Sequence, residues 1–387
     1  MIEQLASNLA HLREGHHYRQ RRRRESATAP VMTFAGRSLL TFCSNDYLGL
    51  ASHPALAEAL CRGAERYGVG SGAAHLISGH TAAHQQLEEE LAAFTGRPRA
   101  LLFGSGYLAN LGVLTALLGR KDALFEDRLN HASLIDGAQL SRATLRRYPH
   151  NDLATLRRLL AESRAPLRLV ASDALFSMDG DSAPLGELAA LCREQQAWLL
   201  VDDAHGFGLL GTQGAGSLEA QRLSSAEVPI LMATLGKALG CYGAFVAGAE
   251  ELIETLIQRA RPYIYTTALP PALAEAALAA LHLVREEPWR RHHLAALIAR
   301  FRQGAAPLGL PLLPSDSAIQ PLLAGSAERA LRWSRWLEQR GILVTAIRPP
   351  TVPQGSARLR ITLSAAHSEQ QIDHLLECLA ELPLEAE

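Results

Sequence analysis

Between about residues 85 and 250, short apolar runs alternate with longer stretches whose apolar residues recur at helical spacing. Runs this short, flanked by glycine or polar residues, are typical of buried strands, and the stretches between them predict helices, including one at 184–196 that has proline near its start. The apolar runs that predict strands are 100–103, 167–176, 198–201 and 230–233. Such alternation predicts an α/β fold with a mainly parallel sheet covered on both faces.

The two ends of the chain have a different pattern. Residues 1–24 carry Leu5, Leu9 and Leu12 at helical spacing, which predicts an amphipathic helix. Short strands interrupted at Gly36 are expected within 31–43. After Pro270 and Pro271 the pattern changes again. It predicts a long helix, short strands and a closing helix, at 272–304, around 318–323 and 358–363, and at 368–381.

These changes in pattern divide the chain into three expected parts. Residues 1–47 form an N-terminal helix with short strands, 48–268 a large α/β domain, and 269–387 a smaller α+β domain. In an open parallel sheet the carboxyl ends of the strands lie along one edge, where ligands bind. We therefore expect the functional residues of the large domain to follow its strands.

Composition gives little evidence for a charged partner. Of 387 residues, 48% are hydrophobic and 20% charged, with a formal net charge of −1. One basic run stands out, Arg21, Arg22, Arg23 and Arg24. Such a run is typical of a solvent-exposed face of the protein. The alternative is an arm that binds nucleic acid, although the run lacks interleaved aromatic residues.

Five scattered cysteines form no Cys-x-x-Cys pair, and no His-Glu-x-x-His pattern occurs, so neither a metal site nor a disulfide framework is predicted. The N-terminus lacks the apolar stretch of a secretory signal, and no apolar run is long enough to span a membrane. These features indicate a cytoplasmic protein with reduced thiols.

Lys237 is one of only two lysines, the other being Lys121, in a chain whose positive charge comes almost entirely from arginine. An amine that must lose its proton cannot be replaced by a guanidinium. Asp202 follows the apolar run 198–201 and is thus expected at the end of a strand. A lysine that can form a Schiff base and a carboxylate that can keep a pyridine nitrogen protonated are what pyridoxal phosphate requires. Asp202 could instead be a turn or cap residue.

Other residues near strand ends add candidate ligands. Gly106 and Tyr107 follow the strand at 100–103 and begin a helix, whose N-terminus can bind an anion. Ser177 and Thr234 offer hydroxyl groups, and His205 lies three residues after Asp202. His131 could stack on an aromatic cofactor ring or be an interior hydrogen-bonded histidine.

Arg358 and Arg360 alternate on a predicted strand and therefore share one side of it. Guanidinium groups facing a cleft bind carboxylates through paired hydrogen bonds. A solvated face is the alternative.

In this order, the motifs resemble those of the α-oxoamine synthase family of fold-type I pyridoxal-phosphate enzymes, over nearly the whole chain. The segments that carry the resemblance are 44–50, 104–107, 127–133, 176–180, 202–208, 234–237 and 358–367. The resemblance implies a large domain with a mainly parallel seven-stranded sheet flanked by helices, a smaller C-terminal domain, and homodimers with active sites at the interface.

The resemblance also implies roles for individual residues. Lys237 corresponds to the cofactor-binding lysine, with Asp202, His205 and His131 as the other catalytic residues. The remaining cofactor ligands implied are Gly106, Tyr107, Ser177, Thr234, Thr266 and Thr267, the last two for the phosphate in the neighbouring subunit. The substrate ligands implied are Arg19, Asn45, His131, Thr351 and Arg360.

The compact length and the segment 348–353 are most similar to the members that act in biotin biosynthesis. These acyltransferases condense L-alanine with a pimeloyl thioester, carried by CoA or acyl carrier protein, and release CO2. Related members with the same catalytic residues remain alternatives: 2-amino-3-ketobutyrate ligase, 5-aminolevulinate synthase and serine palmitoyltransferase. The segment 71–75 departs from the family pattern, since Ala73 and Ala74 make it less glycine-rich, and it lies near the substrate channel in the family.

Overall fold

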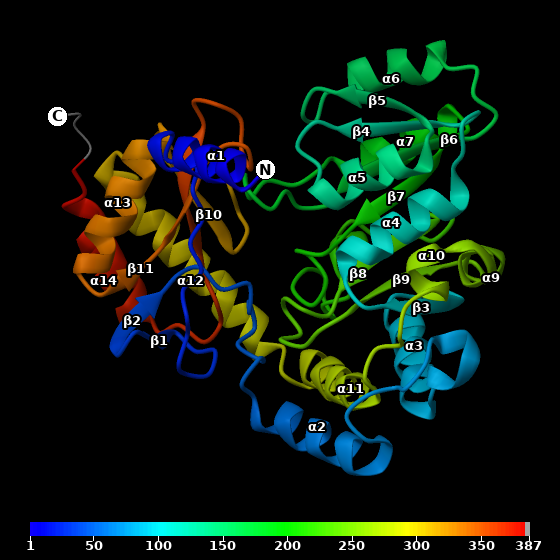
Figure 1. Ribbon diagram of the computed structural model, residues 1–387, viewed down its shortest axis with the longest axis horizontal. Helices are drawn as coiled ribbons and strands as arrows, with labels where there is room; N and C mark the ends of the chain where they lie inside the picture. The colour runs from blue at the N-terminus through cyan, green and yellow to red at the C-terminus, as the bar shows by residue number, and fades with distance from the viewer. Residues whose placement is uncertain (384–387) are drawn as a thin grey trace. The chain divides into compact units, whose positions relative to one another are not determined.

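The computed structural model describes residues 1–383. The chain forms two compact units, drawn in Figure 1. The larger unit comprises Leu50–Ser177 and Ser182–Arg291. The smaller unit comprises Met1–Gly49, Met178–Asp181 and His292–Glu387. The domain boundaries expected at 47/48 and 268/269 stay a prediction.

The larger unit is built on a seven-stranded sheet with the strand order β3-β9-β8-β7-β6-β4-β5. Its strands are β3 (Arg99–Phe103), β4 (Ala123–Asp127), β5 (Thr144–Tyr148), β6 (Arg168–Asp173), β7 (Trp198–Asp202), β8 (Ile230–Thr234) and β9 (Ala244–Gly248). Only β9 runs antiparallel to its neighbours, β3 and β8. The predicted mainly parallel sheet is therefore confirmed.

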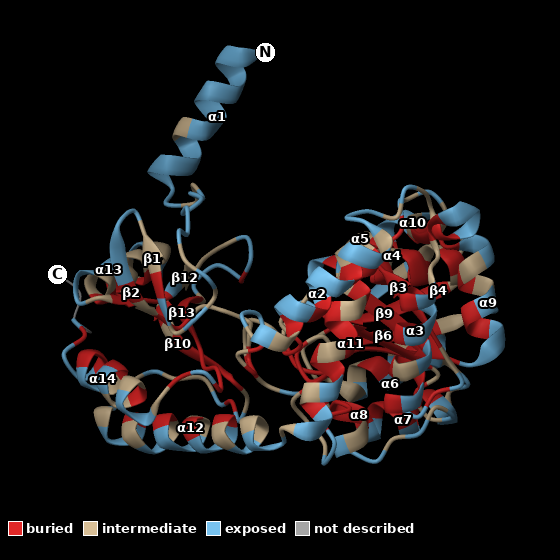
Figure 2. Cartoon of the chain, turned by 90° about the horizontal axis from the view of Figure 1, so that it is seen from below, coloured by how far each residue is buried: buried red, intermediate tan, exposed pale blue. Residues whose placement is uncertain are grey.

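Helices cover both faces of this sheet and enclose a core on each (Figures 1 and 2). One face packs against α4 (Gly106–Leu117), α5 (Ala132–Ser141), α9 (Glu250–Arg259) and α10 (Arg261–Ile264). The other packs against α6 (Leu153–Glu162), α7 (Leu185–Glu194) and α8 (Ser217–Ala220). Side chains alternate between faces, so Leu200 enters the first core while Leu199 and Val201 enter the second.

Three more helices of the larger unit pack together beside β3 and β9. They are α2 (Pro54–Tyr67), α3 (Ala82–Phe94) and α11 (Pro271–Glu286), and a π-helical turn, η1 (His75–Gly79), precedes α3. Helix α2 approaches α11 closely at Gly63, where an added Cβ would lie 2.7 Å from the Ala272 Cα.

The smaller unit contains two three-stranded sheets with orders β1-β2-β11 and β10-β13-β12. Their strands are β1 (Val31–Phe34), β2 (Arg37–Thr41), β10 (Ile319–Gly325), β11 (Ile342–Leu343), β12 (Thr345–Ile347) and β13 (Ala357–Thr362). Its helices are α1 (Ile2–Glu14), α12 (Trp289–Ala305), a 3-10 turn η2 (Ala306–Leu308), α13 (Ala327–Gln339) and α14 (Glu369–Ala380). The expected strands at 31–43 and the closing helix are confirmed.

Two predicted helices were wrong in extent. Helix α1 ends at Glu14, because Gly15 caps it and His16 adopts a left-handed φ of 58°, so residues 15–24 are not helical. No residue of α1 is buried, as Figure 2 shows. The long helix expected at 272–304 is two helices, since Pro288 lacks the amide hydrogen that would continue α11. Among the described residues, no helix is both long and apolar enough to cross a membrane.

Glu126 is a buried acidic residue of the sheet, on the strand next to the edge strand β5. It lies on β4 and is completely buried, and neither carboxylate oxygen has a hydrogen-bond partner within residues 1–383. Burial raises the pKa of Glu126 to about 8, although Arg147 on the neighbouring strand opposes the shift. The carboxyl group is therefore neutral in the folded protein at pH 7.

This shift predicts a specific pH dependence of stability. The folded protein holds the Glu126 proton up to about pH 8, whereas an exposed glutamate in the unfolded chain loses it near pH 4.3. Stability from this group is thus complete below the lower value and falls as pH rises toward the higher one. Between pH 6 and pH 9, wild type should lose roughly 2–3 kcal/mol more unfolding free energy than Glu126→Gln. Denaturant unfolding of both proteins at the two pH values measures this; equal losses would contradict the assignment.

Candidate active site

The carboxyl ends of the parallel strands border a cavity of about 140 Å³ in the larger unit. Eight residues singled out from the sequence line it: Gly106, Tyr107, His131, Ser177, Asp202, His205, Thr234 and Lys237. They come from positions more than a hundred residues apart and meet because each follows a strand of one sheet. The structure thus brings these eight predicted residues together.

Lys237 lies three residues beyond β8, and its side chain is half-buried. Its Nζ is 2.8 Å from Nε2 of the buried His205, which lies in the turn after β7. Residues 235–243 hold the lysine in place: Gly240 donates to the Lys237 carbonyl at 2.9 Å and adopts a φ of 64°. A Cβ at Gly240 would lie 2.3 Å from the Ala51 amide nitrogen, so the turn requires glycine.

Asp202 is the last residue of β7, and its carboxylate is held on both oxygens. Oδ1 accepts the Ala204 amide hydrogen at 3.0 Å, and Oδ2 accepts an Nδ2 hydrogen of Asn110 at 2.8 Å. Asn110 lies on α4 and also donates to Ser133 Oγ at 2.9 Å. These donors fix the direction of the Asp202 carboxyl group toward the cavity.

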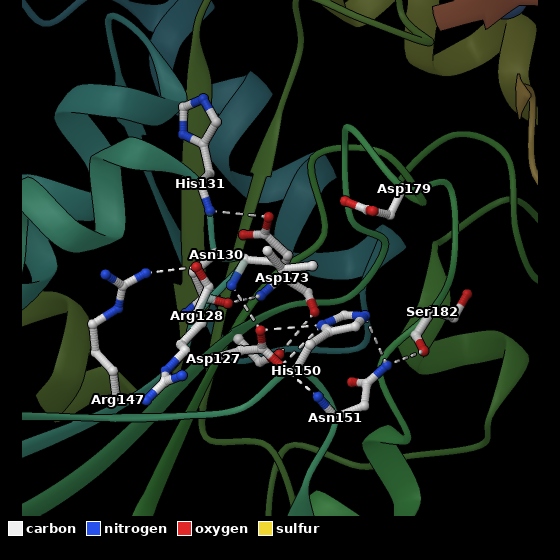
Figure 3. A network of polar contacts seen from close by, with 12 residues as sticks. Asp127, Arg128, Asn130, His131, Arg147, His150, Asn151, Asp173, Asp179 and Ser182 are labelled. Carbon is white, nitrogen blue, oxygen red and sulfur yellow. Dashed lines mark hydrogen bonds and ion pairs between the residues drawn. The ribbon is translucent and has the colours of Figure 1, made fainter. Parts of the chain in front are cut away.

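A second carboxyl group, Asp173, lies opposite Asp202 on the neighbouring strand β6. Its Oδ2 accepts the His131 amide hydrogen at 3.1 Å, as Figure 3 shows, while Oδ1 has no partner among residues 1–383. Burial and then the nearby Asp202 charge raise the pKa of Asp173 well above its ordinary value. Of these two adjacent carboxyl groups, Asp173 therefore favours the neutral form.

His131 begins α5 as its N-cap residue, with Nδ1 accepting the Ser133 amide hydrogen at 3.3 Å and lying 2.7 Å from Ser133 Oγ. The residue is exposed, and its ring points away from the Asp173 carboxyl group (Figure 3). An exposed ring at the border of a cavity is placed to stack on a planar ligand.

Helix α4 directs its N-terminus at the cavity through Gly106 and Tyr107. Ser105 caps this helix by accepting the Leu108 amide hydrogen. The first-turn amides are not used by the helix itself and can bind a phosphate. The Tyr107 hydroxyl donates to Asp136 Oδ2 at 2.5 Å.

The groups around the cavity fit pyridoxal phosphate. Lys237 supplies an amine, and Asp202 a carboxylate at the strand end. The helix N-terminus and Ser177 supply donors for a phosphate, whereas the Thr234 hydroxyl donates to the Gly243 carbonyl at 2.9 Å. Asp173, whose buried Oδ1 has no partner among residues 1–383, is a further polar residue that lines the cavity. A covalent anchor, an anion site and a counter-ion for a ring nitrogen are thus present in one cavity.

Four of the five predicted substrate ligands lie in the smaller unit, where they form two pairs, while His131 lies in the larger unit. Arg19 donates to Thr351 Oγ1 at 3.2 Å, and both residues are exposed. Arg360 is buried on β13 and donates to Asn45 Oδ1 at 3.0 Å. The alternative of a solvated face for Arg360 is wrong.

Arg358 has a different role from the one suggested by its alternation with Arg360. It is buried, and its Nη1 contacts Asp179 Oδ1 at 2.7 Å and donates to the Met178 carbonyl at 3.0 Å. The expectation that it presents its guanidinium to a ligand carboxylate is therefore wrong: its partner is an aspartate of the same chain.

Thr266 and Thr267 lie in the loop after α10, half-buried and exposed respectively. Neither is among the residues that line the cavity. Their expected role toward the phosphate of a neighbouring subunit stays a prediction.

Several residues of the site were not singled out from the sequence. Asp173 is the last residue of β6, as Asp202 is of β7, but it lies inside the apolar run 167–176 from which the strand was predicted, so it was not recognised as a strand end. Asn110 could not be recognised from the sequence, because it lies inside an apolar helix and its partner Asp202 comes close only in the folded chain. Ser133, Ala204 and Met232 complete the lining.

The aminotransferase class I and II family profile matches residues 37–379. The chain belongs to this class. Its mainly parallel sheet and its cavity with a lysine agree with this assignment. Among solved structures, a Sphingomonas wittichii serine palmitoyltransferase superposes with a TM-score of 0.92 at 29% identity, covering 98% of this chain and 96% of that one. The 8-amino-7-oxononanoate synthase of Francisella tularensis gives a TM-score of 0.78 at 35% identity, covering 89% and 97%.

Relatives that are similar over nearly their full length identify the family within this class. A Methylococcus capsulatus protein is 61% identical over 98% of this chain and 99% of its own length. Proteins of Cellvibrio japonicus and Pseudomonas putida are 57% and 58% identical over 98% of this chain and 95% and 97% of theirs. All three are named 8-amino-7-oxononanoate synthase. Within the aminotransferase class, the chain belongs to the 8-amino-7-oxononanoate synthase family.

Proposed function

We propose that this protein is the acyltransferase that condenses L-alanine with a pimeloyl thioester. The products are 8-amino-7-oxononanoate, CO2 and the free thiol carrier, in biotin biosynthesis. One observation carries the proposal: Lys237 Nζ lies 2.8 Å from His205 in a cavity that also contains Asp202, in a chain of the synthase family. Serine palmitoyltransferases share the fold at 28–29% identity, about half the identity to the named synthases.

The cofactor would be held by residues of the larger unit. Pyridoxal phosphate, when bound, supplies a carbonyl carbon that an amine can attack and a ring that withdraws electrons from the amino acid α-carbon. Lys237 Nζ would hold that carbonyl carbon, and Asp202, oriented by Asn110, would pair with the ring nitrogen. Gly106, Tyr107, Ser177 and Thr234 would bind the remaining polar groups, and His131 would stack on the ring.

Lys237 would also act as the base in the reaction. Once L-alanine has displaced it, the free amine takes the proton from the alanine α-carbon. The 2.8 Å contact with His205 Nε2 keeps Nζ at the cavity during this exchange. The α-carbon would then bond to the thioester carbonyl carbon and expel the thiolate. The alanine carboxyl group would depart as CO2, and a proton would take its place on the α-carbon.

Substrate binding would involve the smaller unit. Arg360, held by Asn45, offers a guanidinium for the alanine carboxylate. Arg19 and Thr351, which hydrogen-bond to each other, would bind the acyl donor. We also propose a cytoplasmic homodimer in which Thr266 and Thr267 bind the phosphate in the partner subunit. Their position outside the cavity of their own chain and the free state of all five cysteines support this view.

A panel of amino acids and acyl donors tests the proposed reaction. Thiol release should be at least about 100-fold faster with L-alanine and pimeloyl-CoA or pimeloyl-acyl carrier protein than with glycine and acetyl-CoA or L-serine and palmitoyl-CoA. Mass spectrometry should identify 8-amino-7-oxononanoate as the product. Faster thiol release with either of the other pairs would reassign the enzyme to a sister reaction.

A further inference from the structure

Three histidines outside the cavity come together at the start of α3 in the larger unit. His75 begins η1, His80 follows that turn, and His84 lies in the first turn of α3. One ring nitrogen of each lies within 4.8 Å of those of the other two. His75 and His84 are buried and His80 is half-buried. The proposed reaction uses none of them.

The rings have the spacing of imidazoles that share a metal ion. Their centroids are 5.0, 5.2 and 5.6 Å apart, and His75 Nδ1 is 2.9 Å from His80 Nδ1. Zinc–nitrogen bonds of about 2.0–2.1 Å in a tetrahedral site would place the nitrogens about 3.4 Å apart and the ring centroids about 5 Å apart. A small adjustment of the two Nδ1 atoms would therefore admit an ion.

The hydrogen bonds of His80 and His84 determine which ring nitrogen of each could bind an ion. Nε2 of His84 lies 2.5 Å from the Leu269 carbonyl, and Nε2 of His80 lies 3.3 Å from Gln85 Oε1. Both partners accept a hydrogen bond, so each ring carries its hydrogen on Nε2 and has a lone pair on Nδ1. Metal-binding histidines usually have such an outer acceptor. In the structure His84 Nδ1 accepts from the Thr81 amide, and His80 Nδ1 contacts His75 Nδ1.

We propose that His75, His80 and His84 bind a divalent transition-metal ion through their Nδ1 atoms, with Zn²⁺ as the preferred ion and water in the fourth position. Imidazole ligands suit zinc and its neighbours in the first transition row. The ion would replace the His75–His80 contact and the bond from the Thr81 amide to His84 Nδ1, which is 3.0 Å long. The His-x4-His-x3-His spacing fits no pattern considered in the sequence, which predicted no metal site.

The ion would stabilise two hydrogen-bonded segments of the larger unit, 71–75 and the loop that carries Thr266 and Thr267. Ala73 accepts the Ala268 amide hydrogen at 3.0 Å, and Ser71 Oγ donates to the Leu269 carbonyl at 2.6 Å. The His75 ring stacks on Tyr263 at 4.9 Å. The metal would thus stabilise both the segment 71–75 and the loop that carries Thr266 and Thr267.

Calorimetric titration of Zn²⁺ into the untagged, EDTA-treated holoenzyme tests this site. We expect one ion per chain and a rise in the unfolding temperature on binding. His80→Ala should weaken zinc binding by at least about 100-fold, because even loss of an outer partner can cost that much. His374→Ala, at an exposed position on α14, is the matched control and should bind zinc as wild type does.

Two further measurements keep the test decisive if His80→Ala folds poorly. His75→Asn should weaken zinc binding to a similar degree, with its fold checked by circular dichroism. Co²⁺ added to wild type should give the visible absorption of a tetrahedral site, and Zn²⁺ should remove it. Absence of zinc uptake by wild type, or uptake that survives both histidine substitutions, would overturn the proposal whatever the outcome of the activity assays.

Discussion

Lys237→Ala should lower the rate of thiol release at least about 10⁴-fold, the upper range for loss of a positioned acid–base group. The substitution removes both the covalent anchor of the cofactor and the amine that takes the α-proton. Lys237→Arg should be equally inactive, because a guanidinium keeps the charge but cannot deprotonate. Absorbance of the purified variants should lack the band of covalently held cofactor, and steady-state thiol release gives the rate.

Lys121→Ala is the matched control, since Lys121 is the one other lysine and lies exposed in the turn before β4. It should keep wild-type absorbance and activity. A Lys237→Ala protein that retains the band of covalent cofactor would show that another amine anchors it.

Asp202→Asn should lower kcat by about 10²–10³-fold, comparable to the loss of one preorganised electrostatic group. The neutral amide no longer keeps the ring nitrogen protonated. One of its two terminal atoms is also an NH2 that must face either Asn110 Nδ2 or the Ala204 amide, and both of these are donors. This mismatch should cost about 1–3 kcal/mol of unfolding free energy.

Asp173→Asn offers a close comparison, because this residue lies opposite Asp202 in the sheet and favours the neutral form. It should lower kcat about tenfold or less, well below the loss expected at Asp202. Steady-state kinetics and urea unfolding of both variants give the two comparisons. Equal losses of kcat at the two positions would contradict the assignment of the charged carboxylate to Asp202.

Four strands of the sheet, β3, β6, β7 and β8, were predictable because they are short apolar runs. Asp202 and Thr234 are the last residues of β7 and β8, and Lys237 follows within three residues. Strand ends of a parallel sheet share one edge, so residues at the ends of successive runs meet in the cavity. Chain position and local pattern therefore carried most of the information about the cofactor site.

Features that depend on long-range packing were not predictable. The division of the Ala/Leu-rich run after Pro271 is different, because Pro288 is a local signal in the sequence that the predicted single helix did not take into account. Asn110 and the three-histidine cluster show their partners only in the folded chain. Arg358 and Arg360 have the same local pattern but different partners, Asp179 and Asn45, which lie far away in sequence.

Borohydride reduction followed by peptide mapping tests the central role of Lys237 most directly. The holoenzyme is reduced, digested and analysed by mass spectrometry, and the mass of one reduced cofactor should appear on the peptide that contains Lys237. The chain has only two lysines, so Lys121 is the one other lysine that could carry the cofactor. The cofactor mass on Lys121, or on neither lysine in a protein that retains activity, would contradict the account.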